Sequence, residues 1–162
     1  MKKILVYLDT SYINYLVASR LPDKMQDSLA LWNIFIASEY FEIVLSEIVG
    51  EELQRCYEPK RSRLLEKLAE IKSHFVTETD EITDLADRYV EFGVLSPNDY
   101  YDLLHIAYAT TSGCKLIVSW NFKHFVNFKT MDMVNAVNLI EGYDPIRIVS
   151  PSMLLGEFEN EG

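Results

Sequence analysis

The sequence predicts an α/β domain in which helices cover both faces of a short, mostly parallel central sheet. Its 162 residues fit one ordinary domain, which we expect over residues 1–156, followed by an acidic tail over residues 157–162 that frays. Hydrophobic residues make up 49% of the chain and charged residues 25%, which excludes a disordered or collagen-like chain. Short apolar runs alternate with helical segments from end to end, and this alternation is typical of a parallel sheet.

Short apolar runs predict the strands of the N-terminal half, and capping residues and prolines mark its helices. Residues 3–8 form a nearly continuous apolar run, which is typical of a strand buried on both faces. The side-chain oxygens of residues 9–11 can cap a helix that reaches about residue 19, and Pro22 can open a second helix. The elements expected next are a strand over 41–45, a helix capped by Ser46 that breaks at Glu58-Pro59, a helix over 64–71 and a short strand at 75–76.

The C-terminal half continues the same alternation. A helix is expected over roughly residues 80–92. Ser96-Pro97-Asn98-Asp99 then forms a strong helix start, with serine at the cap, proline in the first turn and an acid three positions on. This helix is expected to end near Gly113 and to be followed by a strand over 115–120, a helix over 130–140 and a last strand over 146–149.

Charge and cysteine content narrow the range of functions. The chain has 25 acidic against 15 basic residues and a net charge of −10, which argues against a protein that coats duplex DNA. An acidic chain can still cut nucleic acid if its carboxylates hold cations. Cys56 and Cys114 lie far apart without a CxxC pattern, so we interpret them as reduced thiols. No apolar run reaches the length of a membrane span or of a signal sequence, and we expect a cytoplasmic protein without a membrane partner.

Polar residues at the ends of the predicted strands point to a metal site. Asp9 immediately follows the first strand and Asn121 follows the strand over 115–120, so both can face a crevice at the carboxyl ends of parallel strands. Glu52 lies about two turns into the helix after the second strand, and Asp102 lies one turn inside the helix that starts at Ser96. Hard carboxylate oxygens without cysteine or a dense histidine set suit Mg²⁺ or Mn²⁺.

Four segments of the chain together resemble the motifs of PIN-domain nucleases, and more specifically the VapC-type toxin ribonucleases. Asp102 to Ala109 resembles the helix motif DxxHIAxA and is the most specific of the four. The others are Leu8-Asp9-Thr10-Ser11, Ser46 followed by Glu52-Leu53, and Leu116 to Phe125. The motifs occur in family order, and the resemblance spans residues 4 to about 149.

The resemblance implies a three-layer α/β/α fold and the metal-dependent cleavage of RNA. Asp9, Glu52 and Asp102 match three acids that hold Mg²⁺ or Mn²⁺, and Asn121 takes a fourth, usually acidic, catalytic position. Because an amide adds no negative charge, we expect one tightly held ion. Many bacterial and archaeal single-domain members are toxins of type II toxin–antitoxin pairs, which implies an antitoxin partner, and such members commonly form homodimers.

Each of these acids also has a purely structural interpretation or a rival nearby. Asp9 could serve only as a helix cap. Glu47 and Glu51 compete with Glu52, although the spacing from Ser46 favours Glu52. Asp99 competes with Asp102, but a capping box with Ser96 explains Asp99 without catalysis.

The roles of two histidines and two alternative functions of the protein stay open. His105 is interpreted as a satisfied structural histidine, and His124 is an equally balanced candidate for the outer part of the site. A PIN-like binding module with a decayed site is an alternative, because Asn121 replaces an acid. A phosphotransfer receiver-like or phosphatase domain also places an aspartate after its first strand, but the chain lacks the paired aspartates and the late lysine that it needs.

Overall fold

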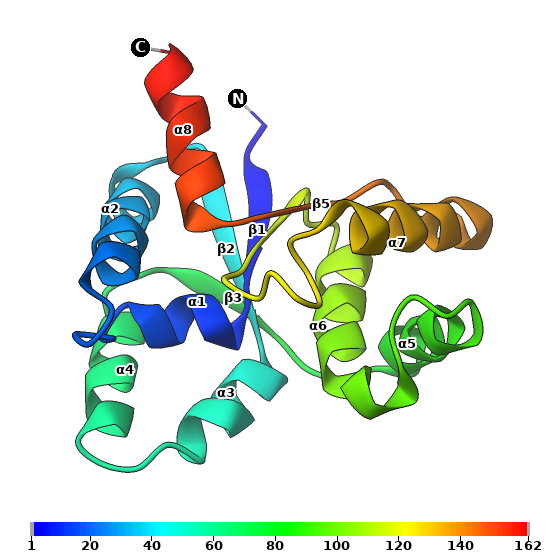
Figure 1. The fold of residues 1–162 in the computed structure, drawn as a ribbon, viewed down its shortest axis with the longest axis horizontal. Helices are drawn as coiled ribbons and strands as arrows, with labels where there is room; N and C mark the ends of the chain where they lie inside the picture. Colours follow the sequence, from blue (N-terminus) through cyan, green and yellow to red (C-terminus); the bar gives the residue numbers. More distant parts are fainter. Residues whose placement is uncertain (1, 162) are drawn as a thin grey trace.

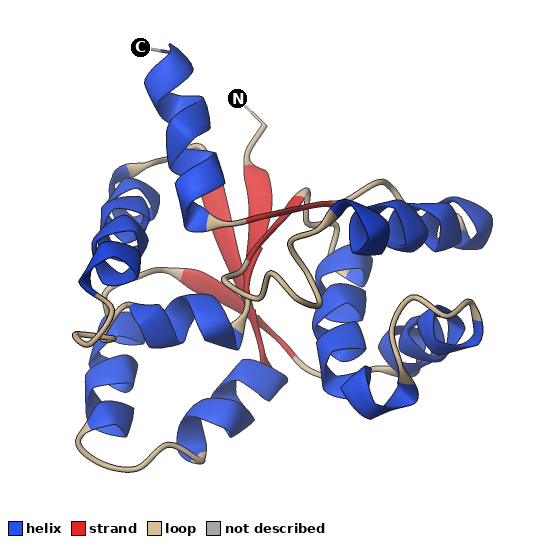
Figure 2. Cartoon of the chain, in the orientation of Figure 1, coloured by secondary structure: helices blue, strands red, loops and turns tan. Residues whose placement is uncertain are grey.

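The computed structural model describes residues 2–161 and contains a five-stranded parallel sheet (Figures 1 and 2). The strand order is β3-β2-β1-β4-β5, and every neighbouring pair is parallel. All the predicted strands are present: β1 (Ile4–Leu8), β2 (Phe41–Ser46), β3 (Ser73–Val76), β4 (Leu116–Val118) and β5 (Arg147–Val149).

Helices cover both faces of this sheet. One group lies against the first face: α1 (Thr10–Tyr15), α2 (Pro22–Ala37), α3 (Glu47–Gln54), α4 (Lys60–Ala69) and α8 (Pro151–Glu161). The other group lies on the opposite side in Figure 1: α5 (Asp80–Glu91), α6 (Tyr100–Thr111), with a 3₁₀ turn, Pro97–Asp99, before it, and α7 (Phe128–Glu141). The predicted three-layer α/β/α fold with a parallel central sheet is therefore confirmed.

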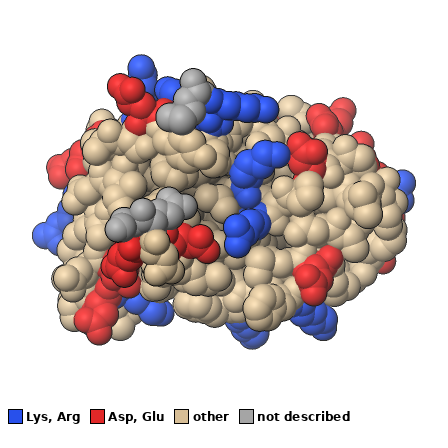
Figure 3. All heavy atoms as spheres, turned by 90° about the horizontal axis from the view of Figure 1, so that it is seen from above, with Lys and Arg blue, Asp and Glu red and all other residues tan. Residues whose placement is uncertain are grey.

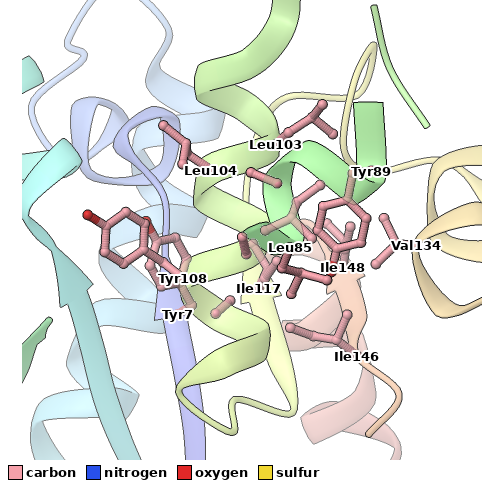
Figure 4. Close-up of a cluster of buried hydrophobic side chains, with 14 of the residues drawn as sticks. Tyr7, Leu85, Tyr89, Leu103, Leu104, Tyr108, Ile117, Val134, Ile146 and Ile148 are labelled. Carbon is pink, nitrogen blue, oxygen red and sulfur yellow. The ribbon is translucent and has the colours of Figure 1, made fainter. Parts of the chain in front are cut away.

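The central strands β1, β2 and β4 become buried on both faces toward their carboxyl ends, as their apolar runs predict, whereas the edge strand β3 is largely exposed. Along β1, Val6 and Leu8 pack against α1, α2 and α8, whereas Tyr7 points to the other face. That second face forms a cluster with α5, α6 and α7, drawn in Figure 4. Side chains on the two faces of the sheet therefore belong to two separate hydrophobic cores.

The order of the strands places the functional end of the molecule. The chain leaves β1 for β2 and β3 on one side and returns to β4 and β5 on the other, so the direction of winding reverses between β1 and β4. In open parallel sheets, ligands bind at the carboxyl ends of the strands beside such a switch point. Leu8 is paired with Val118, and the Asp9 amide donates to the Val118 carbonyl at 3.3 Å, so the residues after these two strands are neighbours.

The C-terminal helix α8 is the largest departure from the prediction. Residues 157–161, expected to fray as a tail, are the last turns of this helix, and Gly162 lies outside the described residues. Ser150 caps the helix by accepting from the Met153 amide at 3.2 Å, and Leu154 is buried against the first core. The capping pair Ser150-Pro151 repeats the pattern that marks residues 96–97.

Two smaller points complete the comparison. Helix α1 ends at Tyr15, several residues before the expected end near residue 19. Of the helices within residues 2–161, none combines the length and the hydrophobicity needed to span a bilayer.

Candidate active site

Asp9 is a buried carboxylate at the end of β1, in the switch region between β1 and β4. Its side chain is 3% exposed and accepts hydrogen bonds from the Ser11 hydroxyl at 2.8 Å, the Tyr12 amide at 2.9 Å and the Ser119 hydroxyl at 2.5 Å. Asp9 therefore does cap α1, but the cap uses only part of its acceptor capacity.

The charge of Asp9 has no cationic partner among residues 2–161: no lysine, arginine or histidine nitrogen lies within 4.0 Å of it. Burial raises the pKa of Asp9, against the opposing influence of the charge of His105 and of the hydrogen bonds from Ser119, Tyr12 and Ser11. The folded chain thus holds a carboxylate that lacks a positive charge beside it.

At the opposite edge of the sheet, where the strands begin, acidic side chains lie among basic ones. Figure 3 views the molecule from the side on which β1 begins, and Lys and Arg are interspersed there with Asp and Glu. Lys3 pairs with Glu42 at 3.8 Å, and Lys115 pairs with Asp144 at 3.5 Å. Glu42 and Asp144 at the amino edge are therefore each paired with a lysine, and Asp9 at the carboxyl edge is not.

Glu52 lies on α3 and contacts a histidine of α6. Its Oε1 lies 2.9 Å from Nε2 of His105, which projects from α6. Burial favours the neutral acid, but the hydrogen bond and the charge of His105 outweigh it, so the pKa of Glu52 is lowered. The rivals behave differently, since Glu47 accepts from the Glu78 amide at 3.3 Å and Glu51 is exposed.

Asp102 lies in the first turn of α6 and bonds to the second histidine. Its Oδ2 is 2.7 Å from Nδ1 of His124, and Oδ1 of Asp99 is 3.8 Å from Nε2 of the same ring. The predicted capping box between Ser96 and Asp99 is wrong. Ser96 instead accepts from the Asn98 amide at 3.2 Å and caps the short 3₁₀ turn, so α6 begins at Tyr100 and the Asp99 carboxylate faces His124.

Asn121 closes the turn after β4. Its side-chain carbonyl accepts from the His124 amide at 3.0 Å, and its own amide donates to the Ser119 hydroxyl at 2.9 Å. The amide oxygen of Asn121, expected to face a water or a second ion, therefore holds the turn that carries His124 to Asp102.

In the part of the chain that the structure describes, Glu52 and Asp102 bond to different histidines, and no hydrogen bond joins any two of the three predicted acids. His105 bonds Glu52, its charge acts on Asp9, and it lies one helical turn from Asp102 on α6. Within residues 2–161, the ligand atoms of Asp99, Asp102 and His124 form the one group of three that all lie within 4.8 Å of one another, and Asp9 and Glu52 are outside it.

One contributor, Tyr7, escaped the sequence interpretation, whereas Ser119 lies beside a predicted site residue and is open as a residue that orients a carboxylate. The Ser119 hydroxyl reaches Asp9, and the Tyr7 hydroxyl reaches His105. A tyrosine within an otherwise aliphatic strand is a usable signal, because a buried hydroxyl normally finds a partner. The contact of Ser119 with Asp9 agrees with the interpretation of this hydroxyl as one that orients a carboxylate.

The donor set fits a hard divalent cation. The predicted ligands are carboxylates, and Asp9 is buried without a positive charge. The Thr10 hydroxyl, directly after Asp9, is buried and contributes to the lowered pKa of Glu52, which links the two predicted ligands. An ion with its water ligands would supply the missing positive charge beside Asp9.

Comparisons with known proteins agree with this architecture. The PIN domain family model matches residues 6–125, which include all four motifs. The chain is also similar to a chain of the crystal structure of VapBC2 from Rickettsia felis bound to a DNA fragment from their promoter. The TM-score is 0.52 and the identity 14%, over 91% of this chain and 98% of that chain, so the likeness concerns the fold. No curated protein gives a significant match to the sequence. Because the family model covers well over half of its length, the chain belongs to the PIN domain family.

Proposed function

We propose that this protein is a metal-dependent endoribonuclease that hydrolyses phosphodiester bonds of RNA and acts as the toxin of a type II toxin–antitoxin pair in the cytoplasm. The observation that carries the proposal is the buried, cation-free carboxylate of Asp9 at the switch point between β1 and β4. The contacts of Glu52 from α3 with His105 and of Asp102 from α6 with His124 support a role for these two acids in the same site. Membership of the PIN domain family supports a nuclease.

In this proposal, Asp9, Glu52 and Asp102 hold one Mg²⁺ or Mn²⁺ ion. Such an ion lowers the pKa of a bound water and polarises a phosphate. The chain's own groups orient the carboxylates: Ser119 and Ser11 fix Asp9, and His105 fixes Glu52. This fixed geometry removes reorganisation that would otherwise oppose catalysis.

Around Asp102, the chain supplies a further restraint. His124 bonds the Asp102 carboxylate through Nδ1, and Asn121 fixes the turn that presents His124. Asn121 thus contributes to the catalytic arrangement as a positioning residue in this proposal. Its side chain keeps one free NH₂ group for a phosphate or a water.

The test is cleavage of single-stranded RNA by the purified protein in Mg²⁺ or Mn²⁺ and in excess EDTA. We expect cleavage only with the divalent ion. Cleavage that is equally fast in EDTA would contradict the metal-dependent mechanism, and Asp144→Asn, at the amino edge of the sheet, serves as an inert control.

The toxin role has its own support and its own test. The solved structure with a similar fold contains VapBC2, and our proposal extends the idea of a cognate partner to this chain. Expression of the chain should arrest growth, and co-expression of the product of an adjacent small gene should relieve the arrest and co-purify with it. Growth that is unchanged by the active nuclease would contradict the toxin role. Homodimer formation is proposed as well, and light scattering of the pure protein measures it.

A second candidate is a PIN-like binding module that has lost catalysis. Asn121 favours it, because this residue adds no charge and its carbonyl is occupied by the His124 amide. Such a module would bind its protein partner but would show neither RNA cleavage nor a rise in melting temperature with Mn²⁺.

A further inference from the structure

A buried chain of hydrogen bonds leads from the end of β2 to the Glu52 carboxylate. We infer that Tyr7 and His105 are positioning residues, which lock Glu52 in the orientation that binds the divalent ion. The inference deepens the proposed function and rests on it. It is carried by contacts between side chains from β1, β2, α3 and α6.

Three contacts in series make up this chain. The Ser46 hydroxyl lies 2.7 Å from the Tyr7 hydroxyl, which lies 2.5 Å from Nδ1 of His105, and Nε2 of His105 lies 2.9 Å from Oε1 of Glu52. Ser46 and Tyr7 are fully buried, and His105 is 3% exposed. Water therefore cannot replace these partners without opening the core.

For a neutral imidazole, the chemistry of the groups sets the direction of every bond in this series. An ionised carboxylate can only accept, so Nε2 of His105 carries the hydrogen and donates it to Glu52. In the neutral ring Nδ1 is then the acceptor, and the Tyr7 hydroxyl donates to it. Tyr7 has no second hydrogen, so the Ser46 hydroxyl donates to the Tyr7 oxygen. Each group in the series thus fixes the next one.

The packing of the imidazole supports a fixed orientation. The Tyr7 ring meets the imidazole edge-on, with centroids 5.7 Å apart, and the Phe125 ring does so from 6.3 Å. The ring therefore cannot turn without displacing core aromatics.

Glu52 itself needs an external restraint. It has a long side chain that is only about half-buried, and its unrestrained rotamers would have to be frozen when an ion binds. His105 bonds the Glu52 carboxylate at 2.9 Å and lowers its pKa more than the Thr10 hydroxyl does. Orientation of this ligand consequently depends on His105, and orientation of His105 depends on Tyr7. Partners of this kind, one shell away from a metal, influence affinity strongly.

The test is Tyr7→Phe, which keeps the ring and removes the hydroxyl that bonds His105. We expect the dissociation constant for Mn²⁺ alone, measured by electron paramagnetic resonance of the free ion, to rise about tenfold or more. The melting temperature without metal is measured alongside, to establish that the variant is folded.

Tyr89→Phe is the matched control. Tyr89 is equally buried in the same cluster, and Figure 4 shows it on the far side from Tyr7. Its hydroxyl donates to the side-chain carbonyl of Asn138 at 2.5 Å, away from the acids. This variant loses a buried hydroxyl too, but its Mn²⁺ dissociation constant should stay within about twofold of the wild type, because no metal-orienting partner is lost.

A double-mutant cycle decides whether Tyr7 acts through Glu52. In a Glu52→Gln background, Tyr7→Phe should change the Mn²⁺ dissociation constant by less than about twofold, because the group to be oriented is gone. An unchanged constant in Tyr7→Phe, or the same loss in both backgrounds, would overturn the inference while leaving the proposed function intact.

Wild-type protein that binds no Mn²⁺ would overturn the proposed function, and this inference with it. If Tyr7→Phe does not fold, His105→Leu takes its place, because it removes the contact with Glu52 directly and keeps the Ser46 hydroxyl that caps α3 by accepting from the Val49 amide. We then expect a rise of at least about twofold in the Mn²⁺ dissociation constant, and no change would overturn the inference.

Discussion

Neutralising Asp9 should separate the stability of the fold from the binding of metal. In Asp9→Asn the side-chain carbonyl can still accept from the Tyr12 amide, so the cap of α1 is kept. The hydrogen bonds from Ser11 and Ser119 lose their charge assistance, at about 1 kcal/mol each. This loss is offset because a buried charge without a cationic partner disappears. We expect the metal-free variant to be as stable as the wild type at pH 7, to within about 1 kcal/mol.

Unlike the stability of the metal-free fold, the stabilisation that bound Mn²⁺ supplies should depend strongly on Asp9. At a Mn²⁺ concentration 100 times its dissociation constant, binding stabilises the wild type by about 2.7 kcal/mol. For a domain of this size that corresponds to a rise in melting temperature of roughly 5–10 °C. Asp9→Asn should lose most of this rise, and Asp144→Asn, whose carboxylate pairs with Lys115 at the other edge, should keep it.

Thermal melts with and without Mn²⁺ measure both terms in one series. A rise in Asp9→Asn equal to that of the wild type would refute the role of Asp9 as a ligand. A collapse of the metal-free fold would refute the view that its charge is uncompensated.

The pKa of Asp9 determines how the stabilities of the wild type and of Asp9→Asn depend on pH. Burial, opposed by His105, Ser119, Tyr12 and Ser11, raises the pKa of folded Asp9 above its ordinary value of 3.8. The folded state therefore binds the proton more tightly than the unfolded state does. Stability falls as the pH rises from about 4 through the folded pKa. The stability of metal-free Asp9→Asn relative to the wild type should therefore increase over this window, as urea titrations at several pH values can establish.

Three further predictions concern the other acids of the site and the anchor of α8. Asp102→Asn should reduce RNA cleavage by about 100-fold or more, whereas Asp99→Asn should reduce it by less than about tenfold; a reversed order in the cleavage assay would exchange their roles. Leu154→Ala should lower the free energy of unfolding by about 2–3 kcal/mol, because this leucine anchors α8 in the first core; a urea titration that shows no loss would make α8 dispensable. Burial alone would raise the pKa of Glu52, but the contact with His105 outweighs burial and lowers it. The ionised carboxylate therefore stabilises the metal-free fold at pH values above its ordinary pKa of 4.5. This stabilisation is lost as the pH falls through the folded pKa. Glu52→Gln should accordingly flatten the acid limb of the curve of stability against pH, and curves of equal steepness would contradict the bond to His105.

The sequence predicts the layers of this fold because its central strands are buried on both faces. A strand covered by helices on both sides must be apolar at every position, and residues 4–8 show this directly. The positions of Asp9 and Asn121 also follow, because polar residues directly after parallel strands share one edge of the sheet. Both predictions depend on local patterns only.

Contacts between distant segments could not be predicted in this way. Glu52 and His105 are 53 positions apart, and Tyr7 and His105 are 98 apart, so their hydrogen bonds depend on how α3 and α6 pack against the sheet. Asp99 illustrates the same limit at short range. Its position three residues after Ser96 is that of a capping box, but a 3₁₀ turn leaves its carboxylate facing His124.

Helix α8 was missed for a different reason. Residues 157–162 are polar and acidic, and composition alone favours a solvated tail there. Tertiary contacts override this preference. Leu154 is buried, and the ring of Phe158 packs on that of Phe41, with centroids 5.8 Å apart. The helix is therefore stabilised by its apolar face rather than by its overall composition.

A crystal structure of the protein with bound Mn²⁺ tests the central claim most directly. The anomalous signal of manganese locates the ion independently of any assumption about its ligands. We predict a single site with carboxylate oxygens of Asp9, Glu52 and Asp102 at about 2.0–2.4 Å from the ion. An ion held instead by Asp99, Asp102 and His124, the group already within 4.8 Å of one another, would contradict the proposed metal centre.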